Sequence, residues 1–377
     1  MSKISPFHFA GRPDARWQMQ QAEGRERLRL KVPSWASVEA LHYPVRLSVE
    51  QCSSEVAARY KAEVAQRLCP LGGRFVDLTG GFGVDFAFVA QAFSEARYVE
   101  RNADLVAIVR HNLPLLGLPT AEVCHGDGVA VLQTMSPVDL LLLDPARRDT
   151  AGRKTVLLAD CEPNVVALHD LLRAKSRWTM LKLSPMLDVA EALRGLPSVT
   201  EVHIVAVGGE CKDLLLVLGE RSPADAPIPI HCIDTPHRFS FTFEEEATAV
   251  APLATTLETY LFEPSPAVLK AGAFRTLCTR FGVKKLHPNT HLYTASEDVP
   301  AFPGRRFRID AVSGFSKKEI RPLTGQKANL AVRNFPQSVG TLRTKLRLLD
   351  GGDAYWFATT MGEREHLLVR THKLPVE

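Results

Sequence analysis

A glycine-rich turn that begins at Asp77 is the segment of this sequence best suited to holding a ligand. A strand-like apolar run ends at this acid, and Thr79-Gly80-Gly81-Phe82-Gly83 follow it. Glycines let the backbone approach a bound nucleotide closely, because a Cβ would collide with it. A dinucleotide-binding turn has a further glycine three residues after Gly83, where this sequence has Phe86. Without a diphosphate to hold, Asp77 or Asp85 can pair with an ammonium group on the ligand.

Three more acids follow strand-like runs further along the chain. Glu100 ends the second run, 23 positions after Asp77, where its carboxylate can accept both ribose hydroxyls of an adenosine. Asp127, in His125-Gly126-Asp127-Gly128, can accept from an adenine amino group. Asp144 follows the fourth run, in Asp144-Pro145-Ala146-Arg147-Arg148. Open α/β sheets bind ligands at the carboxyl ends of their strands, so these four positions predict one nucleoside site.

Short apolar runs alternate with longer amphipathic stretches, which predicts a parallel sheet with helices on both faces. The predicted strands are Arg74 to Leu78, Arg97 to Glu100, Ala121 to His125, Val138 to Leu143, Trp178 to Leu183, Val199 to Val207 and Lys212 to Leu218. The connection between the last two is so short that the final strand needs an antiparallel neighbour. A helix from about Ser53 to Leu68, with Val56, Tyr60, Val64 and Leu68 on one face, precedes the sheet.

Breaks in composition divide the chain into four predicted parts. Residues 1–60 form an N-terminal helical region, and residues 61–222 hold the sheet. The Pro/Ala/Asp-rich stretch from Arg221 to Pro229 is typical of a linker. Residues 230–302 form a small α+β domain, with a strand at His237 to Phe243, a helix at Pro266 to Phe281 and an extended run at His287 to Thr294. Pro303-Gly304 then begins a basic domain, 303–377, that ends in two strand-like runs.

Composition narrows the class of protein. No apolar run reaches the roughly 18 residues that a membrane span needs, and no secretory signal is visible, so we expect a cytoplasmic protein without a membrane partner. The seven cysteines are scattered and form no C-x-x-C pair, which favours reduced thiols. His287 and His291 stand four residues apart but lack a third ligand, so we expect no metal site.

The order of these motifs resembles the class I S-adenosylmethionine-dependent methyltransferases, above all the RNA-modifying members and the trimethylguanosine-synthase-like branch. Val76 to Asp85, Tyr98 to Asn102, Gly126-Asp127 and Asp144-Pro145 look like their successive motifs. An antiparallel last strand is also their arrangement, and a plain dinucleotide fold does not require it. The longer pattern resembles bacterial methyltransferases with a ferredoxin-like insert and a THUMP-like C-terminal domain. It includes Leu181-Lys182-Leu183-Ser184-Pro185, Gly208 to Asp213, Ala328 to Pro336 and Gly351 to Phe357.

The resemblance implies a Rossmann-like methyltransferase sheet followed by small α+β domains, with S-adenosyl-L-methionine as cofactor and tRNA or rRNA as substrate. It implies cofactor binding at Asp77, Gly80, Gly81, Gly83, Glu100 and Asp127, and we add the adjacent Thr79, Asp85, Arg101 and Gly128. It also implies catalysis near Asp144.

The catalytic segment departs from the usual pattern. Amino-group methyltransferases of nucleic acids place a second proline and an aromatic after the acid, and the aromatic stacks on the flipped base. Ala146 and Arg147 occupy those positions here. Arginine can stack on a base or hold a phosphate, so we predict Asp144, Pro145, Arg147 and Arg148 as the catalytic set. Lys182, Ser184 and Glu210 lie at strand ends and are candidates for the substrate side. A uracil-C5 mechanism would need a cysteine nucleophile, but Cys161 and Cys211 fit buried structural positions better.

Positive charge gathers near the end of the chain. From Pro303 to Leu349, eleven lysine and arginine side chains stand against two carboxylates, which suggests a polyanion partner. The predicted RNA-binding residues are Arg305, Arg306, Lys317, Lys318, Arg321, Lys327, Arg333, Arg343 and Lys345. A solvated basic face is the alternative. Two rival functions also stay open: a nicotinamide-dependent oxidoreductase, which Phe86 disfavours, and a non-catalytic RNA-binding protein that retains a cofactor pocket.

Overall fold

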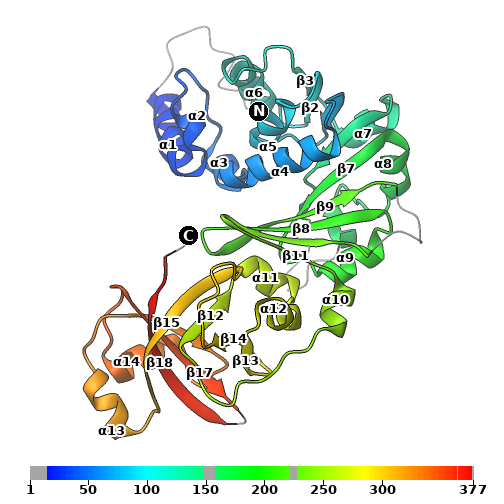
Figure 1. The fold of residues 1–377 in the computed structure, drawn as a ribbon. Helices are drawn as coiled ribbons and strands as arrows, with labels where there is room; N and C mark the ends of the chain where they lie inside the picture. The colour runs from blue at the N-terminus through cyan, green and yellow to red at the C-terminus, as the bar shows by residue number, and fades with distance from the viewer. Residues whose placement is uncertain (1–14, 148–157, 221–226, 363, 376–377) are drawn as a thin grey trace. The chain divides into compact units, whose positions relative to one another are not determined.

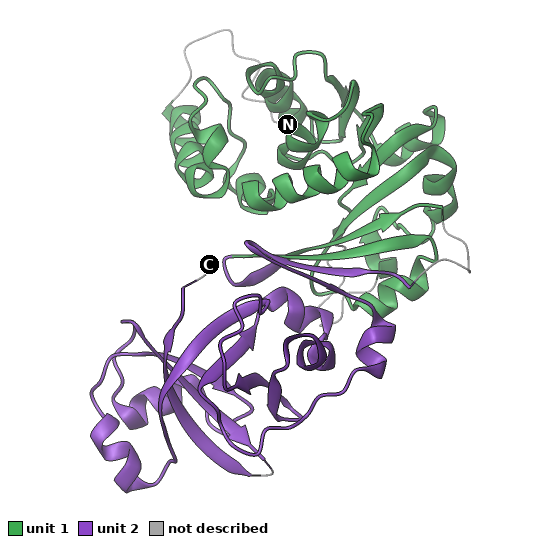
Figure 2. Cartoon of the chain, viewed as in Figure 1, with its two compact units in different colours: residues 1–207, 212–226 green, residues 208–211, 227–377 purple. Residues whose placement is uncertain are grey.

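The computed structural model describes residues 15–147, 158–220, 227–362 and 364–375 (Figure 1). The chain divides into two compact units (Figure 2). Unit 1 comprises residues 1–207 and 212–226, and unit 2 comprises residues 208–211 and 227–377. No helix among the described residues is long and apolar enough to cross a membrane.

Four helices begin unit 1: α1 (Ala15–Lys31), α2 (Pro33–Ala36), α3 (Arg46–Gln51) and α4 (Glu55–Leu68). The predicted helix at 53–68 is confirmed as α4. Its N-cap is Ser54, whose side chain accepts from Ala57 N, and Glu55 lies in the positive first turn. Tyr60, Val64 and Leu68 are buried as predicted, whereas Val56 is exposed.

The sheet of unit 1 has the predicted strands. They are β1 (Arg74–Asp77), β2 (Glu95–Glu100), β3 (Glu122–His125), β4 (Val138–Leu143), β7 (Ser176–Leu183), β8 (Val199–Val207) and β9 (Glu210–Leu218). Within unit 1 the order is β8-β9-β7-β4-β1-β2-β3. Strands β2, β1, β4 and β7 run parallel, whereas β9 runs antiparallel to β7. The predicted parallel sheet with an antiparallel last strand is therefore confirmed.

Helices connect these strands: α5 (Val84–Ala90), α6 (Ala103–Leu115), α7 (Gly128–Thr134), α8 (His169–Lys175) and α9 (Val189–Gly195). Phe86, at the position where a dinucleotide turn has glycine, is fully buried in α5. Its ring stacks on Phe75 at 5.5 Å and meets Tyr98 edge-on at 5.6 Å. The residue therefore belongs to the core between helix and sheet, where no ligand phosphate could approach.

A short hairpin follows β4 that the sequence pattern did not indicate. Strand β5 (Ala146–Arg147) pairs antiparallel with β6 (Cys161–Glu162), and a 3-10 turn, η2 (Leu158–Asp160), precedes β6. Arg147 lies opposite Cys161 in this pair. The predicted catalytic residue Arg148 lies outside the described residues.

Unit 2 begins with a hairpin of β10 (Ile230–Asp234) and β11 (His237–Phe241), followed by helix α10 (Phe243–Thr248). A seven-stranded sheet has the order β13-β14-β12-β15-β18-β17-β16. Its strands are β12 (Tyr260–Pro264), β13 (Lys284–His287), β14 (Thr290–Ala295), β15 (Gly304–Ser313), β16 (Asn329–Arg333), β17 (Ala354–Met361) and β18 (Glu365–Lys373). The break predicted at Pro303-Gly304 falls at the start of β15, within this sheet.

The helices of unit 2 correct one prediction. They are α11 (Pro266–Ala271), α12 (Phe274–Phe281), α13 (Lys317–Ile320) and α14 (Val339–Leu346), with a 3-10 turn, η3 (Arg321–Leu323). The single helix predicted from Pro266 to Phe281 is wrong, because Gly272 ends α11 with a φ of +79°. A left-handed glycine is a common helix stop, and the chain restarts two residues later.

Candidate active site

A cavity of about 1120 Å³ opens at the carboxyl ends of the parallel strands of unit 1. The glycine turn, the ends of β1, β2 and β4, the segment before α7, and residues of α3 and the β5–β6 hairpin line it. All ten predicted cofactor-binding residues belong to its wall: Asp77, Thr79, Gly80, Gly81, Gly83, Asp85, Glu100, Arg101, Asp127 and Gly128. The size suits a nucleoside cofactor together with part of a second substrate.

The glycines of this wall are required for two different reasons. A Cβ on Gly80 would lie 2.0 Å from the Tyr98 ring, and one on Gly128 would lie 2.2 Å from the carbonyl oxygen of Leu78. At these two positions the missing Cβ leaves room for neighbouring atoms of the protein itself. A Cβ on Gly81 (φ +54°) would meet the carbonyl oxygen of Thr79 at 3.9 Å, an ordinary contact distance, so a ligand can approach this backbone closely.

Glu100 is held firmly at the end of β2. Its Oε2 accepts from Gly81 N at 2.9 Å, and its Oε1 accepts from Asn102 N at 2.8 Å. Each carboxylate oxygen has a second lone pair, so the group can accept further hydrogen bonds from a diol. The neighbouring Arg101 lies 3.4 Å from Glu162 of β6, which joins the two sides of the cavity through an exposed ion pair.

Asp127 has a structural role as well. It is the N-cap of α7, and its Oδ1 accepts from Ala130 N at 3.0 Å. The residue is exposed, so the second oxygen is accessible from the cavity. The cap fixes the carboxylate in place at the cavity wall.

Asp144 lies between two polar partners. Its backbone N donates to Thr79 Oγ1 at 2.7 Å, and its Oδ2 accepts from Lys182 Nζ of β7. The Asp144 side chain is 44 % exposed, and it lines the cavity. Pro145 is buried behind it. Lys182 is thereby confirmed at the cavity wall, whereas Ser184 and Glu210 are not among the residues that line it.

Burial and neighbouring charges shift the pKa values of ionisable groups in the cavity wall. Burial raises the pKa of Asp77 to about 8, and Asp85 and Asp144 add to the rise while the hydrogen bond from Thr79 N opposes it. Burial also raises the pKa of Asp144 within the cavity, against the effect of Lys182. Burial acts to lower the pKa of Lys182, but Asp144, Asp85 and Asp213 outweigh it and hold this pKa above its usual value.

Three residues of this region were not predicted as site residues from the sequence. Lys61 of α4, Ser53 before that helix and Asp213 of β9 gather behind Asp85. Lys61 lies in the middle of an amphipathic helix, where a lysine ordinarily faces solvent, yet its side chain is fully buried. The glycine turn that presents Asp85 is the one local pattern near this cluster, and only the fold brings the other members to it.

The cysteines near the cavity do not resemble nucleophiles. Cys161 is buried in β6, and burial raises the pKa of the Cys52 thiol to about 11. Burial likewise raises the pKa of Cys211 to about 11. A nucleophilic cysteine needs a lowered pKa, so these thiols support the structural interpretation.

The cavity offers no ready stacking partner for a base. Phe82 is the aromatic residue among the described residues of its wall, and it is 4 % exposed. From residue 99 to residue 177 the sequence contains no phenylalanine, tyrosine or tryptophan. The segment after β4 therefore cannot supply the aromatic that amino-group methyltransferases of nucleic acids place there.

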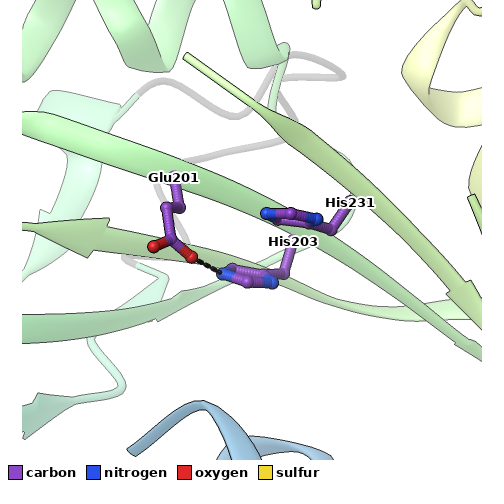
Figure 3. Close-up of side chains that lie close together, drawn as sticks. All are labelled: Glu201, His203 and His231. Atoms are coloured by element: carbon purple, nitrogen blue, oxygen red, sulfur yellow. Dashed lines mark ion pairs between the residues drawn. The ribbon is translucent and has the colours of Figure 1, made fainter. Parts of the chain in front are cut away.

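A second polar cluster in unit 1 lies on β8, away from the cavity wall. His203 Nε2 lies 3.1 Å from Glu201 Oε2 (Figure 3), and His203 Nδ1 shares a hydrogen bond of 2.7 Å with the Tyr60 hydroxyl. Burial lowers the pKa of His203, although Glu201 opposes this. Arg67 of α4 donates to both carboxylate oxygens of Glu201, so these contacts tie α4 to the sheet.

Several basic residues of the predicted RNA-binding set have internal partners in unit 2. Arg305 and Arg333 both donate to the buried carboxylate of Glu263, each through Nε at 2.8 Å. Arg343 pairs with Asp350. Arg306 corrects the prediction, because its side chain is 4 % exposed and pairs with Asp298, so no phosphate can reach it. Arginines on buried strands need a counter-charge there.

The other predicted cations remain at the surface. Lys317, Lys318, Arg321, Lys327 and Lys345 are exposed. The first three lie on α13 and the start of η3, and Lys345 Nζ lies 5.8 Å from the centre of the Phe315 ring. These five members of the predicted set have exposed side chains that are available to a polyanion.

Known proteins share this organisation. Residues 260–303 match a family described as a ferredoxin-like domain, and residues 304–373 match one described as THUMP domain-like. A Porphyromonas gingivalis W83 protein named as a candidate methyltransferase is 36% identical, with a TM-score of 0.87, and the match covers 97% of this chain and 92% of that chain. Two Mycobacterium tuberculosis proteins, each named an uncharacterized S-adenosylmethionine-dependent methyltransferase, are 25% identical over 80% of both chains. This protein therefore belongs to the class I S-adenosylmethionine-dependent methyltransferases that carry a ferredoxin-like and a THUMP-like domain.

Proposed function

We propose that the cavity of unit 1 binds S-adenosylmethionine and that the protein transfers its methyl group to a base of tRNA or rRNA. The observation that carries this proposal is the convergence of Asp77, Glu100, Asp127 and Asp144 on one cavity, each at the end of a different parallel strand or directly after it. We propose residues 61–222 as the cofactor-binding domain, with residues 1–60 as a helical region, 230–302 as a ferredoxin-like domain and 303–377 as a THUMP-like domain.

Each acid is proposed to contact a different part of the cofactor. Glu100 is proposed to accept from the ribose hydroxyls and Asp127 from the adenine amino group. Asp85 already faces Lys61 at 3.0 Å, whereas Asp77 has no ion-pair partner among the described residues. Asp77 is therefore proposed to pair with the ammonium group of the cofactor.

The transfer itself needs positioning more than acid–base chemistry. Bound S-adenosylmethionine supplies an electrophilic methyl group on a sulfonium centre. Asp144 is proposed to accept a hydrogen bond from the acceptor nitrogen and then its proton, so that the nitrogen lone pair points at the methyl carbon. Thr79 and Lys182 hold Asp144 from its backbone and its side chain. Pro145 stiffens the turn, and Arg147 with Arg148 is proposed to hold the base or its phosphate in place of an aromatic.

An RNA acceptor is supported by the THUMP-like match and by the five exposed cations in residues 303–377. The non-catalytic rival keeps one observation in its favour: Asp144 is already paired with Lys182, and no aromatic follows it. The nicotinamide-dependent alternative loses its support, because β9 is inserted between β8 and β7, antiparallel to β7, and Phe86 fills the core.

The deciding experiment is transfer of a labelled methyl group from S-adenosylmethionine to total RNA from a strain that lacks the gene. We expect label in RNA with the wild-type protein and none with Asp144→Ala, although calorimetry shows cofactor binding by both. Cofactor binding without transfer by the wild type would establish the non-catalytic rival. Absence of cofactor binding by the folded wild type would contradict the proposal as a whole.

A further inference from the structure

Lys61 is the most deeply buried cation among the described residues of unit 1. Its side chain is 0 % exposed, and its Nζ contacts three groups from three other segments. Asp213 Oδ2 lies at 2.6 Å, Ser53 Oγ at 2.9 Å and Asp85 Oδ1 at 3.0 Å. Removing one partner from such a buried set is costly, because the remaining charges lose their compensation.

The contacts continue from Lys61 to the cavity. Asp85 also lies 3.8 Å from Lys182 Nζ, and Lys182 donates to Asp144. The result is a row of alternating charges: Asp213, Lys61, Asp85, Lys182, Asp144. The first four side chains are at most 13 % exposed, and Asp144 alone reaches 44 %. The row therefore ends at the carboxylate that faces the proposed acceptor.

Lys182 is shared between competing carboxylates. The negative charges of Asp85, Asp213 and Asp144 all attract its ammonium group. Asp77, Lys31 and the Cys52 thiol also interact electrostatically with members of the row. With Lys61 in place, Asp85 and Asp213 have a cation of their own. Without it, both would draw the Lys182 ammonium away from Asp144.

We propose that Lys61 is a positioning residue for the methyl-transfer site: by neutralising Asp85 and Asp213, it reserves Lys182 for Asp144 and keeps that carboxylate ionised and fixed at the cavity wall. The assignment of Asp144 to the acceptor rests on the proposed function. The charge coupling between Lys61 and Asp144 does not, so the two claims can fail separately.

The test is carbon-13 NMR titration of full-length protein labelled at the aspartate carboxyl carbon, with the Asp144 signal identified by its loss in Asp144→Asn. In Lys61→Met we expect the titration midpoint of Asp144 to rise by about one pH unit, because Lys182 would be drawn partly away from Asp144. A cation within a few ångströms lowers a carboxyl pKa by roughly 1–3 units, so a weaker Lys182 contact raises it. Adding Asp213→Asn to Lys61→Met removes one of the competing carboxylates and leaves Asp85, so it should reverse part of the rise.

Arg59→Met is the matched control. Arg59 lies on the same helix and pairs with Glu55, but it is exposed and belongs to no part of the row, so the Asp144 midpoint should stay unchanged. If Lys61→Met does not fold, Lys61→Met with Asp213→Leu replaces the buried pair by apolar groups, a change that buried ion pairs often tolerate. In that variant Asp85 still lacks its cation, so a smaller rise is expected.

An Asp144 midpoint that is unchanged from wild type in every folded Lys61 variant would overturn the inference. If the wild type also transfers methyl groups, the acid limb of kcat should move upward with the NMR midpoint. A shifted midpoint in a protein that methylates no RNA would refute the proposed function and leave the positioning role of Lys61 intact.

Discussion

Lys182 donates to Asp144 from the neighbouring parallel strand, so a cation and a carboxylate face the same cavity at the ends of β4 and β7. The two residues stand 38 positions apart in the sequence. Their pairing makes Asp144 a fixed acceptor of hydrogen bonds. The pairing of Asp144 with Lys182 also distinguishes this site from methyltransferase sites that hold a base between a carboxylate or amide and an aromatic ring.

Glu100 should dominate recognition of the cofactor ribose. Glu100→Ala removes two proposed charge-assisted hydrogen bonds, each worth about 1.5–3 kcal/mol, so affinity for S-adenosylmethionine should fall by about a hundredfold or more in titration calorimetry. Glu100→Gln keeps an acceptor for one hydroxyl and should lose less. Equal affinity in wild type and Glu100→Ala, or binding of NADH by the wild type, would contradict the assigned site.

Cofactor affinity should depend on pH through Asp77. Its pKa of about 8 means that the carboxyl is mostly protonated at pH 6 in the empty cavity. Pairing with an ammonium favours the ionised form, so binding should release a proton and strengthen as pH rises toward 8. Above that the cofactor's own ammonium, with a pKa near 8, begins to lose its charge.

The proton release is measured by calorimetry in buffers of different ionisation enthalpy. Asp77→Asn cannot ionise, so its affinity should be weaker and nearly flat between pH 6 and 8. A wild-type affinity that is equally flat, with no proton released, would remove Asp77 from the cofactor site.

RNA affinity should depend on the exposed cations of unit 2. Replacing Lys317, Lys318 and Arg321 by alanine should reduce the slope of log affinity against log salt by about 0.7–0.9 for each RNA phosphate that the variant no longer neutralises. Cofactor affinity should not change. An identical slope in the triple variant would show that these residues form an ordinary solvated face.

Arg306→Ala is the comparison within the same segment. Arg306 is buried against Asp298, so the substitution should lower the midpoint of thermal unfolding by leaving an uncompensated carboxylate. The salt slope of the folded variant should match wild type. A flattened slope in Arg306→Ala would mean that the residue reaches RNA after all.

The sheet and the cofactor wall were predictable because their signals are local. Each strand is a short apolar run, and Asp77, Glu100, Asp127 and Asp144 each lie at or directly after the end of one. The antiparallel β9 followed from a connection too short for any parallel crossover. These features depend on residues within a few positions of one another, which a sequence displays directly.

The parts that escaped prediction depend on distant contacts. Lys61 and Asp213 meet across 152 positions, and nothing near either residue marks it as buried. Arg305 and Arg333 counted as free cations until the fold placed both against Glu263. Gly80 was expected to face a ligand, but its lack of a Cβ serves the Tyr98 ring. The type of a residue determines which interactions its side chain can make, but its partners depend on the fold.

The measurement that bears most directly on the central claim compares wild type, Asp144→Ala and Arg147→Ala in transfer of labelled methyl to RNA lacking the modification, with RNA and cofactor affinities measured beside it. We predict transfer by wild type only at an intact Asp144, with RNA affinity little changed in Asp144→Ala. Arg147→Ala should weaken RNA binding more than cofactor binding. Full transfer by Asp144→Ala would contradict the account, because the chemistry would then lie away from the end of β4.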